Sequence, residues 1–212
     1  MGRFAKDDII NDSNKATQKG KIIFLNGVTS SGKTSIAKAM QEIAANAGKH
    51  FYIISNDMFH DLEAGMICYG FVEKEKADSK FEKSWYADKY MTESIVLMYQ
   101  FAAVVAGQGR NIIIDGMLFE TETFIEEYGQ SSYDCMRRAT EGCEVFMVEV
   151  FCPLEECRRR NIARGDRGKN QSHEQHEMMN KNIAYDFSVD TSLEGNDAEE
   201  CARKILAEFM GL

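Results

Sequence analysis

Apolar residues are concentrated in five short stretches of the chain, and longer segments with apolar residues at helical spacing separate them. The five stretches cover residues 21–26, 51–54, 111–116, 144–151 and 185–189. Unbroken apolar runs of this length are typical of strands that are buried on both faces of a parallel sheet. The helical patterns cover residues 33–46, 58–64, 84–106, 120–128, 132–140, 154–163, 171–184 and 197–210. This alternation predicts an α/β fold of three layers, in which helices flank a five-stranded parallel sheet of order 2-3-1-4-5.

The length of 212 residues, of which 44% are hydrophobic, is sufficient for one large domain. We expect this domain to span residues 20–212, with an acceptor or cap region at about 57–137. Residues 1–19 are polar and weakly patterned, which predicts a flexible N-terminal arm. Residues 61–83 combine glycines with a run of charged residues, so we interpret them as an insertion or a mobile cap.

The charge balance of 25 basic and 34 acidic residues gives a net charge of −9. An acidic chain is repelled by nucleic acids and by acidic membrane surfaces, so we expect neither as a partner. No apolar run approaches the roughly 18 residues of a membrane-spanning helix. The six cysteines form no Cys-x-x-Cys pair. We interpret them as free thiols in a reducing compartment, which predicts a cytoplasmic protein.

Residues 27–34 read Gly-Val-Thr-Ser-Ser-Gly-Lys-Thr and match the phosphate-binding P-loop pattern G-x-x-x-x-G-K-S/T. They lie between the first predicted strand and the first predicted helix, which is the context that the motif requires. Gly27 and Gly32 permit a tight turn, so that backbone N–H groups face the phosphate oxygens. Lys33 is expected to reach the β- and γ-phosphates of ATP, and the Thr34 hydroxyl to bind Mg²⁺. The expected nucleotide-binding residues are Gly27, Val28, Thr29, Ser30, Ser31, Gly32, Lys33, Thr34, Ser35 and, from a later segment, Arg160.

Two carboxylates follow predicted strands at the edge where open α/β sheets bind ligands. Asp57 comes after the second strand, where a carboxylate can take a proton from an acceptor hydroxyl near the γ-phosphate. The alternative role for Asp57 is a helix N-cap. Asp115 ends the third strand, where P-loop proteins place a carboxylate that holds Mg²⁺ or its waters. The alternative is a turn residue before Gly116. The strand-end positions favour the catalytic role and the metal role.

A basic segment at residues 158–169 contains arginines at near-helical spacing, followed by an arginine between two glycines. Guanidinium groups suit a triphosphate because they neutralise the charge that develops during phosphoryl transfer. The glycines beside Asp166-Arg167 indicate a hinge, so we expect a lid at about 160–175 that closes over the nucleotide. The alternative is a solvated basic helix end, which the helix dipole favours by itself. The residues expected to act in phosphoryl transfer are Lys33, Asp57, Arg164 and Arg167.

The second half of the chain adds segments of more distinctive sequence. They are Cys152-Pro153-Leu154-Glu155-Glu156-Cys157, Ala163-Arg164-Gly165-Asp166-Arg167 and the run from Tyr185-Asp186 to Val189-Asp190-Thr191-Ser192. Together with the P-loop and the strand ends Ser55-Asn56-Asp57 and Ile114-Asp115-Gly116, they resemble the chloramphenicol phosphotransferase family. The resemblance implies a nucleoside-monophosphate-kinase-like fold and ATP-dependent phosphorylation of a small-molecule hydroxyl. It also implies that Asp57 and Lys33 are catalytic and that Arg164 and Arg167 belong to the lid.

Pattern and resemblance together predict a phosphotransferase that uses ATP and Mg²⁺ and acts on a small-molecule hydroxyl. One alternative is a different P-loop kinase, of the nucleotide-sugar or the shikimate type. The other is a nucleotide-binding switch or NTPase that has no small-molecule acceptor. The strand-end position of Asp57 favours a kinase over a switch, because a switch does not need a base for an acceptor.

Overall fold

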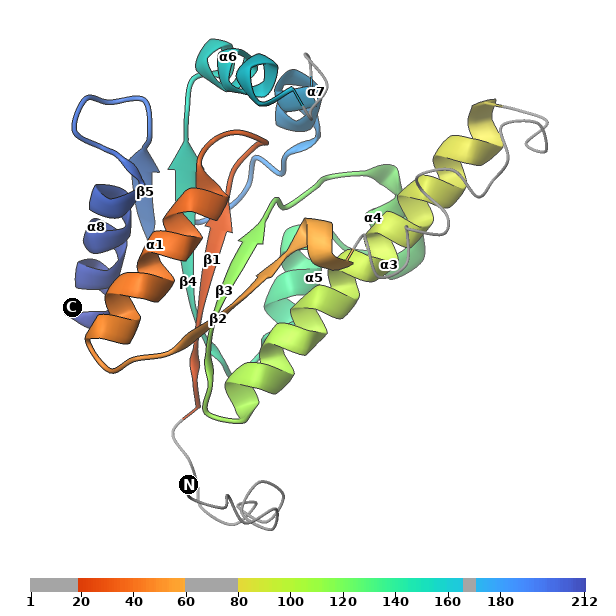
Figure 1. Ribbon diagram of the computed structural model, residues 1–212. Coiled ribbons are helices and arrows are strands. Elements are labelled where there is room, and N and C mark those ends of the chain that lie inside the picture. Colours follow the sequence, from red (N-terminus) through yellow and green to blue (C-terminus); the bar gives the residue numbers. More distant parts are fainter. Residues whose placement is uncertain (1–18, 60–79, 166–170) are drawn as a thin grey trace, which may run out of the picture.

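The computed structural model describes residues 19–59, 80–165 and 171–212. Five strands form one parallel sheet in the order β2-β3-β1-β4-β5, which confirms the predicted topology (Figure 1). The strands are β1 (Lys21–Asn26), β2 (Phe51–Ser55), β3 (Asn111–Gly116), β4 (Glu144–Phe151) and β5 (Phe187–Asp190). The predicted arm, apart from Lys19, and residues 61–79 of the predicted insertion lie outside the described residues.

Helices cover both faces of the sheet and produce the predicted three layers (Figure 1). Helices α1 and α8 cover one face, and α3, α4 and α5 cover the other. Helices α6 and α7 lie beyond the carboxyl ends of the strands. The bounds are α1 (Lys33–Asn46), α3 (Lys80–Gly107), α4 (Glu122–Tyr128), α5 (Ser132–Ala139), α6 (Leu154–Arg164), α7 (Gln171–Met178) and α8 (Ala198–Met210).

The central strand β1 is buried on both faces because its side chains alternate between two hydrophobic clusters. Ile22 and Phe24 belong to the cluster that α3, α4 and α5 complete. Ile23 and Leu25 belong to the cluster that α1 and α8 complete. All four side chains are fully buried. This explains why the sequence shows a continuous apolar run here instead of an alternating one.

Helix α3 has 28 residues and packs along the sheet through one apolar stripe. Its fully buried positions lie three or four residues apart, as one face of a helix requires. They are Ile95, Met98, Tyr99, Ala102 and Ala106. Of the helices in the described ranges, α3 included, none is apolar over a long enough stretch to cross a bilayer.

The helix predicted over residues 171–184 is wrong in its second half, because α7 ends at Met178. The chain then becomes extended, and Met179 forms an isolated antiparallel bridge with Phe119. The amide of Glu120 donates to the carbonyl of Met178 at 2.6 Å, and the amide of Asn180 donates to that of Leu118 at 2.9 Å. These bonds to a distant segment replace the bonds that further helical turns would form. The helical spacing of residues in the sequence does not reveal hydrogen-bond partners that lie far away in the chain.

The end of β1 is tied to this extended segment through Asn26, whose side chain is fully buried. Asn26 Oδ1 accepts a hydrogen bond from the amide of Leu118 at 2.8 Å. Asn26 Nδ2 donates to the hydroxyl of Tyr185 at 2.6 Å. Burial raises the pKa of Tyr185, so its hydroxyl stays protonated. The carboxyl ends of β1 and β3 and the segment before β5 are therefore held together beside the P-loop.

Candidate functional site

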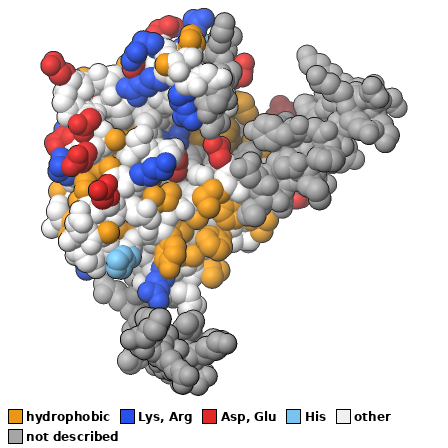
Figure 2. Space-filling view, in the orientation of Figure 1, with side chains coloured by type: hydrophobic (Ala, Val, Ile, Leu, Met, Phe, Trp, Pro, Cys, Tyr) orange, Lys and Arg blue, Asp and Glu red, His pale blue; other side chains and the backbone are white. Residues whose placement is uncertain are grey.

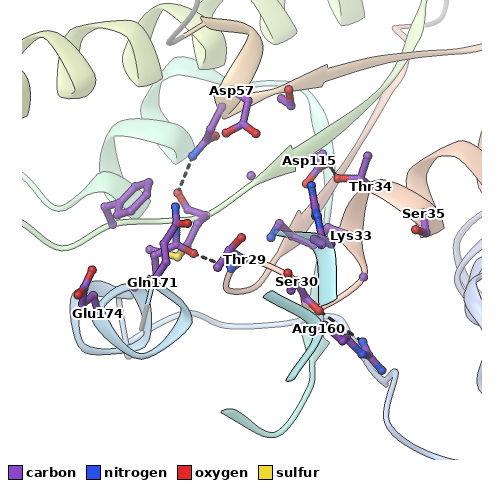
Figure 3. A pocket seen from close by; sticks show the side chains of 18 of the residues that line it. Thr29, Ser30, Lys33, Thr34, Ser35, Asp57, Asp115, Arg160, Gln171 and Glu174 are labelled. Atoms are coloured by element: carbon purple, nitrogen blue, oxygen red, sulfur yellow. Dashed lines mark hydrogen bonds between the residues drawn. The ribbon is translucent and has the colours of Figure 1, made fainter. Parts of the chain in front are cut away.

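A cavity of about 1070 Å³ lies at the carboxyl end of the sheet (Figure 3). Its walls are the P-loop, the segments at the ends of β2 and β3, helices α6 and α7, and Met91 of α3. Parallel strands bring such segments together because all their carboxyl ends lie at one edge. The predicted site residues that line the cavity are Thr29, Ser30, Gly32, Lys33, Thr34, Ser35, Asp57, Asp115, Arg160 and Arg164.

The remaining predicted site residues have other positions. Gly27, Val28 and Ser31 do not line the cavity, and Val28 and Ser31 are buried. They form part of the turn of the P-loop on its side away from the cavity. Arg167 lies outside the described residues, so its expected role in the lid stays a prediction.

The P-loop backbone requires small residues for two different reasons. At Gly27 the reason is close approach, because an added Cβ would lie 2.5 Å from the carbonyl oxygen of Val150. At Gly32 the reason is a left-handed φ of 108°. Ser30 also has a left-handed φ, 60°, which costs a non-glycine residue about 1–2 kcal/mol. Contacts with other segments must therefore hold the loop in this shape.

Two side chains from distant segments provide such contacts. The hydroxyl of Ser30 donates to Oδ1 of Asn161 at 2.6 Å, and Asn161 is fully buried on α6. The hydroxyl of Thr191, just after β5, donates to the carbonyl of Ser31 at 2.7 Å. Lys33 Nζ adds bonds to the carbonyls of Gly27 and Val28, at 2.7 and 2.9 Å. The loop is therefore bound by α6, by the segment after β5 and by its own lysine.

Arg160 connects α6 to the same region and is mostly buried. Its Nη1 donates to the Thr191 hydroxyl at 3.0 Å, and its Nη2 donates to the Thr191 carbonyl at 2.9 Å. Its Nε donates to Glu156 at 2.8 Å. Hydrogen bonds from Arg159 and then from Arg160 lower the pKa of Glu156 to about 2, so this carboxylate stays charged and holds both arginines. The expected contact of Arg160 with a nucleotide stays a prediction.

The two residues predicted to hold a metal ion lie against each other. The hydroxyl of Thr34 donates to Oδ2 of Asp115 at 2.6 Å (Figure 3). Asp115 is an internal member of the β3 ladder, opposite Leu25 and Ser55, and not a turn residue. A hydroxyl and a carboxylate are oxygen ligands of the kind that Mg²⁺ prefers. Among the described residues no cluster of three His, Cys, Asp or Glu side chains could hold a metal ion. The oxygen donors of the pair suit a Mg²⁺ ion whose other ligands are phosphates and water.

Asp57 lines the same cavity (Figure 3). It lies in a helical turn at residues 56–59, directly after β2. The hydroxyl of Ser55 accepts a hydrogen bond from the amide of Met58 at 3.2 Å. Ser55 is therefore the N-cap of this turn, which was the alternative role considered for Asp57. The carboxylate of Asp57 is exposed to the cavity.

Helix α7 covers the cavity with one face, formed by positions i, i+3, i+4 and i+7. These residues are Gln171, Glu174, Gln175 and Met178. The side-chain oxygen of Gln175 accepts a hydrogen bond from the backbone amide of Thr29, at 2.6 Å. An amide of the P-loop is therefore already bound to α7, whose first residues belong to the lid predicted at about 160–175.

Two buried cysteines, Cys152 and Cys157, lie at the junction of β4 and α6. The neighbouring Cys157 thiol lowers the pKa of Cys152 to about 7 against the effect of burial, and Thr191 and Arg160 contribute in the same direction. The same contact and burial raise the pKa of Cys157. The described cysteines are free thiols, as the sequence predicted.

Several residues of the site were missed by sequence reasoning. Thr191 and Tyr185 belong to the segments that resemble the phosphotransferase family, but that resemblance assigned them no contact. Asn161 is the one polar uncharged residue between Arg158 and Arg164, which is a weak signal for burial. Asn26 and Gln175 carry no local signal, because their partners are distant in sequence.

Comparison with known proteins identifies the family of this chain. A family model for chloramphenicol phosphotransferase-like proteins matches residues 20–210. The chain belongs to this family. As a chloramphenicol phosphotransferase-like protein it is a phosphotransferase with an alcohol group as acceptor. A relative from Mycobacterium tuberculosis H37Rv, provisionally named an O-phosphotransferase, is 27% identical over 196 residues, which are 88% of this chain and 81% of the relative.

Solved structures of kinases share the fold of this phosphotransferase. The Mycobacterium tuberculosis APS kinase CysC, in complex with AMPPNP and APS, has a TM-score of 0.63 at 15% identity and covers 90% of this chain and 97% of its own. Shikimate kinase from Acinetobacter baumannii, in complex with shikimate, has a TM-score of 0.54 at 14% identity and covers 92% and 95%. At these identities the likeness shows a P-loop kinase fold and no substrate.

The Thr191→Val variant of this phosphotransferase should be less stable than the wild type by about 1–2 kcal/mol, because the carbonyl of Ser31 and the guanidinium of Arg160 each lose a partly buried hydrogen-bond partner. Urea unfolding followed by circular dichroism measures the change. Thr191→Ser keeps the hydroxyl and is the control. Equal stability of the two variants would contradict the role of the hydroxyl in holding the P-loop.

Proposed function

We propose that this chain transfers the γ-phosphoryl group of ATP to a hydroxyl of a small molecule. The observation that carries the proposal is that one cavity is lined by the P-loop, by the Thr34–Asp115 pair and by Asp57. A volume of about 1070 Å³ is large enough for a triphosphate and a small acceptor together. Family membership supports the transfer reaction.

The P-loop would bind the phosphates through its backbone amides and through Lys33. In the structure Lys33 Nζ binds the carbonyls of Gly27 and Val28. A phosphate oxygen is a stronger partner for an ammonium group than a neutral carbonyl, because the hydrogen bond is charge-assisted on both sides. We therefore expect Lys33 to turn toward the phosphates when a nucleotide binds.

Thr34 and Asp115 would hold Mg²⁺, which supplies positive charge beside the transferring group when it is bound. Asp115 is buried at the end of β3, so the P-loop and the sheet fix its direction. The hydroxyl of Thr34 is already directed at this carboxylate. Arg160 and Arg164 line the cavity beside the P-loop and would neutralise further negative charge during transfer.

Asp57 would act as the base for the acceptor. As the acceptor oxygen forms its bond to phosphorus, its proton passes to the Asp57 carboxylate, and the bond between phosphorus and the bridging oxygen of ADP breaks. The carboxylate is exposed to the cavity and can reach an acceptor there.

Gln175 would compete with a nucleotide for the amide of Thr29. The hydrogen bond from this amide to Gln175 is neutral, whereas a bond to a phosphate oxygen is charge-assisted and stronger. Binding of the triphosphate would therefore break the hydrogen bond between Thr29 and Gln175. The free energy of that lost bond reduces the net affinity for the nucleotide. The contact between α7 and the P-loop would then depend on whether a nucleotide is bound.

The direct test is incubation of the protein with ATP and Mg²⁺ in a metabolite extract, followed by mass spectrometry for phosphorylated products. We expect a product heavier by one phosphoryl group, with stoichiometric ADP. The Lys33→Ala variant should give at least about a hundredfold less product, since it removes the charge that binds the β- and γ-phosphates. ATP hydrolysis with no phosphorylated acceptor would instead indicate an NTPase.

The Asp57→Asn variant should lose about 10²–10⁴ in kcat for the identified acceptor, while its affinity for ATP changes little. Asparagine keeps the size of the side chain but cannot take the proton. Steady-state kinetics with the acceptor, and calorimetric titration with ATP, separate the two effects. Near-normal turnover would show that another group serves as the base.

The Gln175→Ala variant should bind ATP about fivefold more tightly, because loss of one neutral hydrogen bond removes about 1 kcal/mol of competition. Gln175→Glu should bind ATP more weakly than the wild type, since its carboxylate repels the triphosphate. Calorimetric titration measures both. His176→Ala, on the exposed face of α7 away from the cavity lining, is the control and should match the wild type. Binding by Gln175→Ala no tighter than that of the control would rule out the competition.

A further inference from the structure

The charged side chains that line the cavity differ in sign between the elements that carry them. The basic ones come from the P-loop and from α6, and they are Lys33, Arg159, Arg160 and Arg164. Figure 2 shows a group of Lys and Arg side chains over α6. The segments after β2 and β3, helix α3 and helix α7 bring no basic side chain to the described lining. Within the described residues, positive charge is therefore confined to the part of the cavity where the phosphates would bind.

Three carboxylates line the cavity, and one of them has no part in the proposed transfer. Asp115 accepts a hydrogen bond from Thr34, and Asp57 is the proposed base. The third carboxylate is that of Glu174, which lies on the cavity face of α7 and is exposed. A carboxylate in this position is available to a ligand.

Glu174 lies apart from the two residues that would hold the metal ion. Figure 3 shows Glu174 on the far side of Thr29 from Thr34 and Asp115. Repulsion between a carboxylate and the triphosphate falls with their separation, so this position limits it. The negative charge of Glu174 can therefore act on the acceptor instead of on the nucleotide.

An apolar wall lines the same cavity. It comes from α3, from the segment after β3 and from the end of α7, and it consists of Met91, Met117, Phe119 and Met178. Met117 and Phe119 are more than nine-tenths buried, so packing fixes their positions. Apolar walls of binding sites contact the apolar part of a ligand, and unbranched methionine side chains adapt to its shape. A ligand bound here is therefore expected to have an apolar body.

The apolar wall connects the turn that bears the proposed base to α7. Asn56, in that turn, donates from Nδ2 to the carbonyl of Met117 at 3.4 Å. Two residues further along the chain, Phe119 forms its bridge with the residue that follows α7. Glu174 lies one helical turn before the end of α7. The wall therefore runs from the proposed base to Glu174.

We propose that Glu174 determines which acceptors this phosphotransferase selects, and that the acceptor is an amino alcohol with an apolar body between its hydroxyl and its protonated amine. The inference rests on the proposed function, because it places the hydroxyl at Asp57. The apolar body then lies along Met117 and Phe119, and the ammonium group binds the carboxylate of Glu174.

The charge of Glu174 selects in two directions. A hydrogen bond between an ammonium group and a carboxylate is charge-assisted, which favours a cationic acceptor. An anionic acceptor would meet the carboxylates of Asp57 and Glu174 and would be repelled, so the site also discriminates against it. Because Glu174 is exposed, water and salt weaken both effects, and we expect about a tenfold contribution to KM.

The charge of the acceptor can be tested with a metabolite extract separated by cation exchange at about pH 7, where primary amines are protonated. The cationic, neutral and anionic fractions are each incubated with the protein, ATP and Mg²⁺, and phosphorylated products are identified by mass spectrometry. We expect a product from the cationic fraction whose parent compound contains an amine. Products from the other fractions alone would overturn the inference and leave the phosphotransferase function intact. ATP hydrolysis without a product from any fraction would contradict the proposed function, and the inference with it.

The Glu174→Gln variant tests the residue itself. With the identified amine it should raise KM about tenfold, while kcat and the affinity for ATP change little, because only the charge that binds the ammonium group is lost. With the N-acetyl derivative of the same amine, which carries no charge, the variant and the wild type should have equal KM. Steady-state kinetics and calorimetric titration with ATP measure these quantities.

Glu177→Gln is the matched control, because it makes the same substitution on α7 at an exposed position that does not line the cavity. It should match the wild type with both forms of the acceptor. An equal rise in KM for the amine and its N-acetyl derivative would show that Glu174 has only a structural role. A change in ATP affinity alone would assign Glu174 to the nucleotide. Either result, or an unchanged KM for the amine, would overturn the inference.

Discussion

The P-loop keeps its shape because segments from the C-terminal part of the chain bind it through hydrogen bonds and close packing. Thr191 donates to the carbonyl of Ser31 and accepts from Arg160, and Gly27 lies directly against the carbonyl of Val150. The left-handed backbone of Ser30 would otherwise relax. The backbone of the loop is therefore held in shape before a phosphate arrives, and such preorganisation is the main way that proteins stabilise developing charge. The nucleotide site therefore depends on α6 and on the exit of β5 as much as on its own motif.

Sheet register also fixes the other groups that line the cavity. Leu25, Asp115 and Ser55 are paired across three adjacent strands, so the carboxylate next to Thr34 and the turn that bears Asp57 are fixed relative to each other. Below them, the two hydrophobic clusters pack on both faces of β1 and make the strands difficult to shift. The positions of the chemically important groups thus follow from packing in the core.

Helix α3 contributes both to the cavity and to the core. Met91 lines the cavity, and Ile95, Met98 and Tyr99 of the same helix are fully buried against the sheet. The position of Met91 therefore follows from the packing of the helix on the sheet.

The sequence alone determined the strands, their order, most helices, the P-loop and the two strand-end carboxylates. These features depend on local spacing: apolar runs, helical periodicity and a motif whose residues are adjacent in the chain. Only the tertiary structure decided that α7 ends at Met178, that Ser55 caps the turn after β2, and that Gln175, Asn161 and Thr191 hold the P-loop. The physical reason is that each of these outcomes is a competition between hydrogen-bond partners. The partners that the P-loop and the end of α7 bind lie far away in the sequence, so no local pattern can reveal them.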